Sequence, residues 1–254
     1  MDVYLAAAIT CNIQVMKDRT DYKELFLLDS YAYASDALRY YVPKVGKFLL
    51  DSGAFTFVGS KKTKDVDWIS YVDQYADFVK ANNIELFFEL DIDALIGYEK
   101  VVKLRKRLEA RAERQCIPVW HKTRGKQNFI DMCKDYPYVS VGGLVGDGGA
   151  GAKEYCNAVQ KFFPWFIDTA HEKEAKIHAL GFTSIEGLKK YHFDSVDSSS
   201  WTSGHRYGGY CFYHDGKITN KSKEKGKKMI DWQSLSVHNF NEWVKFQRYA
   251  KEHL

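Results

Sequence analysis

The sequence is poor in the residue patterns that build disulfide frameworks and zinc sites. Five cysteines are scattered along 254 residues, and no two of them form a Cys-x-Cys or Cys-x-x-Cys pair. The odd number and wide spacing argue against a disulfide framework, and the missing pairs argue against a common structural zinc site. We therefore expect neither a bound metal nor a cofactor.

Long apolar runs and a strong charge of one sign are absent as well. The apolar stretch at residues 3–9 is short and follows Asp2 directly, which is unlike a secretory signal. No run approaches the length of a membrane span. The formal net charge of +4 permits a polyanionic partner without demonstrating one. We expect a soluble cytoplasmic protein with no membrane partner.

What the sequence does contain is a regular alternation of short apolar runs and amphipathic segments. Most of the runs are continuously apolar, as in strands of a parallel sheet that is covered on both faces. The expected strands are residues 3–9, 25–30, 47–52, 85–90, 117–121, 139–144, 177–181 and 193–198. Eight such units predict an α/β fold, a (β/α)8 TIM barrel formed by one domain over residues 1–254, with an open doubly wound sheet as the alternative.

The last part of the chain, after the eighth expected strand, has a different pattern. Residues 217–228 are rich in lysine and poor in apolar side chains, which predicts an exposed loop. Apolar residues at helical spacing then predict a C-terminal helix over residues 239–254.

Polar residues end several of the apolar runs. In a (β/α)8 barrel the chemistry gathers at the C-terminal ends of the strands. The residues found there are Asp51, Asp91, Asp93, His121, Gly142, Gly143, His178 and Asp197. A strand-terminal aspartate is often only a helix cap, but this recurrence predicts a site at one rim of the barrel.

Three segments carry the most information. Asp51-Ser52-Gly53-Ala54-Phe55 reads either as part of a site or as a tight turn with a core phenylalanine. Residues 194–201 place acidic and hydroxyl groups, with a tryptophan, where a strand interior is expected, which indicates a site rather than core. Residues 142–146 lack the spacing of a dinucleotide fingerprint but expose backbone to a planar ligand.

Together these motifs resemble the tRNA-guanine transglycosylase family. That family has an Asp-Ser-Gly-Gly-aromatic motif, a later Gly-Gly-Leu turn, a strand ending in Met-Gly and a final motif that begins with the nucleophilic aspartate. The counterparts here are residues 51–55, 142–146, 178–181 and 197–208, in the same order. The final motif matches at Asp197, Thr202, Arg206 and Gly208.

The departures from the family are informative. Its zinc-binding cysteine cluster and the insertion that carries it are missing, and the chain is shorter than the tRNA enzymes. In this the sequence resembles the short phage-type members, which place 7-deazaguanine bases into DNA. The resemblance thus implies DNA as the polymer, with tRNA as the alternative, and a preQ0-like 7-deazaguanine base as the small-molecule substrate. The location would be the host cytoplasm if a phage encodes it, and a homodimer is compatible with the sequence.

The resemblance also implies a mechanism. Base exchange with retention at the sugar requires two displacements and two carboxyl groups close together. Asp197 would be the nucleophile on C1′ and form a covalent intermediate, and Asp51 would be the general acid/base. Asp194 is the alternative nucleophile, because Phe193-Asp194 also matches the family's Phe-Asp, but the downstream matches favour Asp197.

The implied contacts fall into two groups. Asp91, or alternatively Asp93, would read the guanine edge, and Phe55 and Leu180 would sandwich the ring. The other base-binding candidates are Ser52, His121, Gly142, Gly143, Leu144 and His178, of which His178 is equally a core or capping histidine. The nucleic-acid-binding candidates are Lys122, Arg124, His205, Arg206 and the lysine-rich segment, for which a solvated charge run is the alternative.

Two further functions stay open at this point. A barrel glycosidase with the same carboxylates would hydrolyse its substrate without an incoming base, although the Gly-Gly-Leu turn favours a base pocket. A catalytically silent nucleic-acid-binding paralogue would be indicated by loss of Asp51 or Asp197, and both are present.

Overall fold

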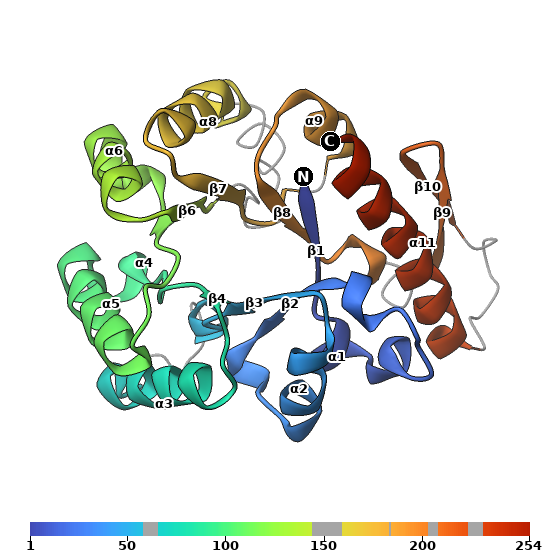
Figure 1. Cartoon of the computed structure of the whole chain (residues 1–254), viewed down its shortest axis with the longest axis horizontal. Coiled ribbons are helices and arrows are strands. Elements are labelled where there is room, and N and C mark those ends of the chain that lie inside the picture. Colours follow the sequence, from blue (N-terminus) through green and yellow to red (C-terminus); the bar gives the residue numbers. More distant parts are fainter. Residues whose placement is uncertain (58–65, 144–158, 183, 203–207, 223–230) are drawn as a thin grey trace.

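The fold is a ring of parallel strands surrounded by helices (Figure 1). The computed structural model describes residues 1–57, 66–143, 159–182, 184–202, 208–222 and 231–254. The eight strands lie in the order β4-β3-β2-β1-β8-β7-β6-β5. They are β1 (Asp2–Ala6), β2 (Phe26–Ser30), β3 (Lys47–Asp51), β4 (Leu86–Phe87), β5 (Val119–Trp120), β6 (Tyr138–Val141), β7 (Lys176–Ala179) and β8 (Ser195–Ser198). Each lies within or overlaps one of the eight predicted runs.

The two edge strands of this order are joined, so the sheet closes. Phe88, just after β4, and Ile117, just before β5, form a parallel bridge. The Glu89 N–H donates to the Ile117 carbonyl at 3.1 Å, and the Ile117 N–H donates to the Phe87 carbonyl at 2.8 Å. The predicted (β/α)8 barrel is confirmed, and the open doubly wound sheet is wrong.

Helices follow most of the strands and cover the outside of the ring. They are α1 (Ala8–Cys11), α2 (Asp36–Tyr41), α3 (Trp68–Ala81), α4 (Asp93–Ile96), α5 (Tyr98–Ala112), α6 (Gly125–Asp135), α8 (Phe163–Glu172), α9 (Ile185–Lys190) and α11 (Trp232–His253). α3 shows why they form: the Asp67 carboxylate accepts from the backbone N–H groups of Ile69 and Ser70, which caps the helix start. The apolar stripe that includes Val72 and Val79 then packs on the strands.

The apolar residues form two groups, one on each side of the strands. The larger group lies between the strands and the outer helices. The smaller group fills the inside of the ring and includes Tyr4, Phe26, Leu49, Phe88 and Val119. Because the interior is packed, a ligand at this barrel has to approach one of its two ends.

The prediction of a loop in the lysine-rich segment is wrong for its first part. Residues 217–222 are not a loop but strand β10 (Lys217–Ser222), which pairs antiparallel with β9 (Gly209–His214). Asp215 and Gly216 join the two strands, both with positive φ, as an Asp-Gly hairpin turn requires. Residues 223–228 lie outside the described residues.

The C-terminal helix begins earlier than residue 239. α11 starts at Trp232, where the Asp231 carboxylate accepts from the Ser234 N–H. Gln247 fastens this helix to the barrel, because its side-chain amide donates to the carbonyls of Val3 and Phe26. No helix in the described part of the chain combines the length and apolar character needed to cross a bilayer.

Candidate functional site

Three carboxylates meet at the C-terminal end of the barrel. Asp51 ends β3, Asp91 follows β4, and Asp197 lies near the end of β8. Burial, followed by the charges of Asp91 and Asp197, raises the pKa of Asp51 to about 7, although a backbone N–H donated by Gly53 opposes the shift. Asp51 keeps some exposure to solvent. A carboxyl with this pKa exchanges protons near neutral pH, as a general acid/base must.

The two carboxylate oxygens of Asp197 differ in their hydrogen bonds to the described residues. Its Oδ1 accepts from the Gly181 backbone N–H at 2.6 Å and lies 3.3 Å from His178 Nε2. Among the residues that the structure describes, Oδ2 has no hydrogen-bond partner. The carboxylate is therefore fixed in orientation through one oxygen, an arrangement that suits a nucleophile.

Asp194, the alternative nucleophile, lies at the other end of the same segment. Its carboxylate accepts from the Ile177 N–H at 2.8 Å and contacts the ring of His171 on α8 at 3.0 Å. It lines a cavity of about 750 Å³ at the N-terminal ends of the strands, together with Asp2 and Lys176. Since side chains alternate along a strand, positions three apart face opposite sides. The geometry favours Asp197 over Asp194.

The Asp51 turn depends on a glycine. Gly53 has φ +71°, and a Cβ at this position would come within 2.4 Å of both Ser30 Oγ and the Ala32 Cβ. Its N–H donates to Asp51 Oδ2 at 3.1 Å, so the turn itself orients the carboxylate. Ser52 does not face the site as expected: its side chain is fully buried and accepts from the Ala54 N–H.

A second group of residues lies beside Asp91. His121 follows β5, and its Nε2 is 3.5 Å from Asp91 Oδ2. This buried nitrogen has no hydrogen-bond partner among the described residues. Gly142 follows β6, and a Cβ there would come within 2.7 Å of the His121 ring, so only glycine leaves room for that ring. Gly143 follows with φ +69° and is exposed.

His178 lies beneath the site rather than in a base pocket, which corrects that expectation. Its side chain is fully buried inside the barrel, against the rings of Tyr4 and Phe88. Its Nδ1 lies 2.6 Å from Ser195 Oγ, which lies 2.5 Å from the Tyr138 hydroxyl. With Nε2–H donating to Asp197, Nδ1 accepts from Ser195, and Ser195 accepts from Tyr138, so every group in the row has a partner.

Sequence reasoning missed Ser195 and Tyr138, although one pattern could have found Ser195. It lies two residues before Asp197 in the same strand and therefore on the same face. Burial raises the pKa of Tyr138, which keeps its hydroxyl protonated and able to donate.

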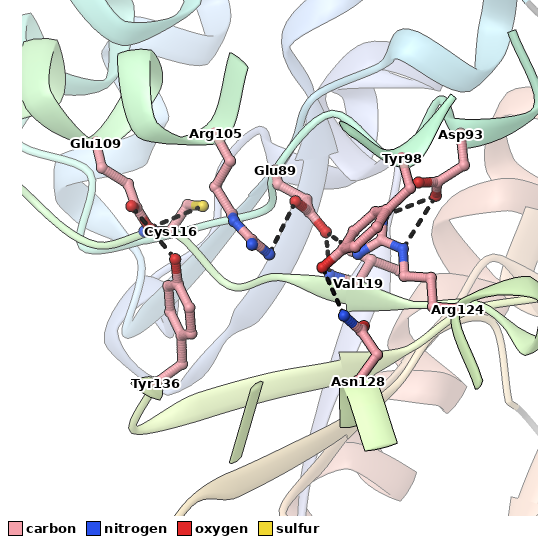
Figure 2. Close-up of polar contacts among 10 residues, drawn as sticks. All are labelled: Glu89, Asp93, Tyr98, Arg105, Glu109, Cys116, Val119, Arg124, Asn128 and Tyr136. Atoms are coloured by element: carbon pink, nitrogen blue, oxygen red, sulfur yellow. Dashed lines mark hydrogen bonds and ion pairs between the residues drawn. The ribbon is translucent and has the colours of Figure 1, made fainter. Parts of the chain in front are cut away.

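Arg124 and Asp93 belong to a buried ionic network and not to the site (Figure 2). Arg124 donates to Glu89 Oε1 and Asp93 Oδ2, both at 2.7 Å, and its side chain is fully buried. Glu89 also accepts from the Val119 N–H and pairs with Arg105 at 3.4 Å. Arg124 cannot reach a phosphate from there, which corrects its expected contact with nucleic acid. Asp93 Oδ2 is held by Arg124, and Asp93 Oδ1 is buried without a hydrogen bond among the described residues. Of the two aspartates, Asp91 is the one that lies beside His121.

The remaining candidates are placed as follows. Lys122 is exposed in a 3₁₀ turn after β5, and Leu180 is half-buried beside the inner apolar group. Trp201 is fully buried, donates to the Ala6 carbonyl at 2.8 Å and packs on α11, so this end of the 194–201 run is core and not site. Leu144, His205, Arg206 and the side chain of Phe55 lie outside the described residues.

Within the described ranges, no group of three or more His, Cys, Asp or Glu side chains is arranged to hold a metal ion. Cys116 and Cys133 are buried, and burial raises the thiol pKa of both. Neither thiol has the lowered pKa of a reactive cysteine.

No family model matches the chain, and no curated protein matches it. Among solved structures, similar ones include the carboxyl transferase domain of Rhizobium etli pyruvate carboxylase. With pyruvate, that structure has a TM-score of 0.46 and 11% identity, over 98% of this chain and 48% of the other. The structure of the same domain with 3-bromopyruvate has a TM-score of 0.43 and 13% identity, and the match covers 77% of this chain and 39% of that one. The chain spans less than half the length of these proteins.

Proposed function

We propose that this chain is a guanine transglycosylase, a pentosyltransferase that replaces guanine in DNA with a 7-deazaguanine base. The observation that carries the proposal is the pairing of two unlike carboxyls at one rim. Asp197 is fixed through one oxygen, its other oxygen has no hydrogen bond from the residues that the structure describes, and Asp51 has a pKa of about 7. Double displacement at a sugar carbon needs such a pair, one group to attack and one to move a proton.

In the first step, Asp197 Oδ2 bonds to C1′ as the bond between C1′ and the guanine N9 breaks. Asp51 gives its proton to the departing base, which leaves neutral. In the second step, Asp51 takes the N9 proton of the incoming base, whose nitrogen bonds to C1′ as the bond to Asp197 breaks. Each step inverts C1′, so the configuration is retained, and Asp51 ends protonated as it began.

Asp91 and His121 suit the recognition of guanine. The guanine N1–H and 2-amino group are donors, so the Asp91 carboxylate is a matching acceptor. The His121 Nε2 is buried without a hydrogen bond among the described residues, as expected of a group that a ligand satisfies. Gly143 exposes backbone beside this pair, where the base carbonyl can bind. Groups that can recognise a base beside the two carboxyls support exchange over simple hydrolysis.

The target nucleotide has to leave its stack before C1′ reaches Asp197. Exposed Lys122, on the turn after β5, is placed at the same end as His121 and can contact a backbone phosphate. DNA is proposed over tRNA because the chain lacks the zinc-binding cysteine cluster of the tRNA enzymes that it resembles.

The test is incubation of the protein with labelled guanine and, separately, duplex DNA, single-stranded DNA and tRNA. We expect label in DNA and little in tRNA. Label in tRNA alone would replace the substrate, and release of guanine without incorporation would indicate a glycosidase. No label in any polymer, from protein shown to be folded by circular dichroism, would sink the proposal and favour a silent nucleic-acid-binding paralogue.

A further inference from the structure

The hairpin of β9 and β10 carries two aromatic rings on its exposed face. Tyr210 and Phe212 are 43% and 40% exposed. Their ring centroids lie 6.3 Å apart and their planes differ by only 20°. The two rings thus form a nearly parallel pair, two residues apart on one strand.

Cations lie on the same face of the hairpin. In the antiparallel register Tyr210 is opposite Lys221, and His214 is opposite Lys217. Directly opposed residues share a face, so both lysines flank the aromatic pair. Both are exposed, and the acid beside them, Asp215 at the turn, is paired with His214 at 3.6 Å.

The edge of β9 that does not pair with β10 is fixed to α11, and Figure 1 shows the two side by side at the outside of the barrel. The N–H groups of Cys211 and Tyr213 donate to the side chains of Asn239 and Glu242 at 2.8 and 2.6 Å. His238 contacts both exposed rings with its own, at 5.9 Å for Tyr210 and 5.3 Å for Phe212. The rings are therefore held in place before any partner binds, which lowers the entropic cost of binding.

We propose that this face, formed by Tyr210, Phe212, Lys217 and Lys221, binds single-stranded nucleic acid. Bases stack on the two rings, and the lysines contact the phosphates on either side. Rings interleaved with cations are the arrangement that single-strand-binding surfaces use, because every base has a flat face and every linkage a charge. The cores of protein–protein interfaces are depleted in lysine, so the two lysines favour a polyanion over an apolar protein partner.

The aromatic face lies on the hairpin that follows β8, the strand that carries Asp197. β9 begins twelve residues after Asp197, so the two are separated by no more than about 40 Å of chain. A nucleic-acid strand that places one base at Asp197 can extend to the hairpin. That the bound strand is DNA rests on the proposed function; that the face binds a single strand does not.

The experiment measures the affinity of a fluorescein-labelled oligothymidine 20-mer by anisotropy. Thymidine contains no guanine, so binding is read independently of base exchange. Tyr210→Ala with Phe212→Ala should weaken binding about 25-fold or more, since stacking contributes at least about fivefold for each ring. Tyr40→Ala on α2 is the control, because this tyrosine is more than half exposed away from the hairpin, and it should leave the affinity unchanged.

The lysines have a separate readout. Lys217→Ala with Lys221→Ala should make the negative slope of log affinity against log salt shallower by about 1.4, at about 0.7 for each phosphate contact in a single strand. Lys100→Ala with Lys103→Ala on α5 removes the same charge elsewhere and should change the slope less. Tyr210→Phe keeps the ring and should bind like wild type.

Three results would overturn the inference. Wild-type protein that does not bind the 20-mer excludes the face as a single-strand site. The same holds for an alanine pair at 210 and 212 with unchanged affinity. A change from dimer to monomer in that pair, measured by light scattering with affinity intact, would assign the rings to a contact between copies. If exchange fails on every polymer while the expected losses here appear, only the proposed function is wrong.

Discussion

His178 Nε2 lies 3.3 Å from Asp197 Oδ1, the same oxygen that accepts from the Gly181 N–H at 2.6 Å. The imidazole comes from below, inside the barrel, and is itself held by Ser195. The contact fixes which Asp197 oxygen is occupied and therefore which one would face a substrate in the proposed reaction.

Replacing His178 should lower the rate of exchange more than the affinity for DNA. A hydrogen bond to a charged group is worth about 1.5–3 kcal/mol, so His178→Ala should reduce kcat about 10- to 100-fold. His178→Gln can still donate to Asp197 and should recover part of the rate. Steady-state kinetics check the split between kcat and KM. A large rise in KM with kcat unchanged would show that His178 does not act through Asp197.

The stability of the fold should fall as the pH rises through the range where Asp51 ionises. The pKa of Asp51 is raised to about 7 in the folded protein from an ordinary value near 4, so the folded state holds this proton more tightly. Between about pH 4 and pH 7 the unfolded chain has lost the proton and the folded chain has not, so stability decreases with pH. Asp29, with a pKa raised to about 6 by burial, acts in the same direction over a narrower range.

The check is the melting temperature of wild type and Asp51→Asn at pH 5 and pH 8. Asparagine has no proton to lose, so the drop in Tm between the two pH values should be smaller in the variant. An equal drop would mean that Asp51 has an ordinary pKa.

Arg124 and Lys122 are two residues apart but should respond to substitution in opposite ways. Arg124→Ala removes the buried partner of Asp93 and one of the two buried cations of Glu89, which costs about 3–5 kcal/mol of unfolding free energy. Lys122→Ala at the exposed rim should leave stability within about 0.5 kcal/mol and weaken DNA binding. Urea denaturation and anisotropy measure the two effects. Weaker DNA binding by an Arg124→Ala protein of unchanged stability would contradict the burial of this residue.

Gly53→Ala should destabilise the protein and lower its activity together. The added Cβ would lie within 2.4 Å of Ser30 Oγ in a backbone with φ +71°, so the turn that orients Asp51 has to move. Overpacking of this kind costs about 1–3 kcal/mol. Gly209→Ala is the control, since that glycine has no positive φ and no atom within 4 Å of the added Cβ. Equal loss in both variants, measured by denaturation, would contradict the clash at Gly53.

The barrel could be predicted from the sequence because its parallel strands are buried on both faces, and eight continuous apolar runs mark them. The β9–β10 hairpin could not be found the same way, because one of its faces is exposed and its second strand is rich in lysine. Asp215-Gly216 was the available sign of it.

The site was only partly predictable, since a strand end shows where a residue lies and not what surrounds it. Arg124 looked like a rim cation because the sequence does not show that Glu89, a charge in the buried segment after β4, needs a partner. Asp194 and Asp197 differ in the face of the strand that they occupy, which alternation alone distinguishes.

The central claim is that Asp197 forms a covalent bond to the sugar. The direct measurement is a denaturing gel of protein mixed with labelled DNA and no incoming base, followed by mass spectrometry of the labelled peptide. The account predicts a protein–DNA adduct at Asp197 in wild type and in Asp194→Asn, and none in Asp197→Asn. An adduct that persists in Asp197→Asn, or one located at Asp194, would contradict it.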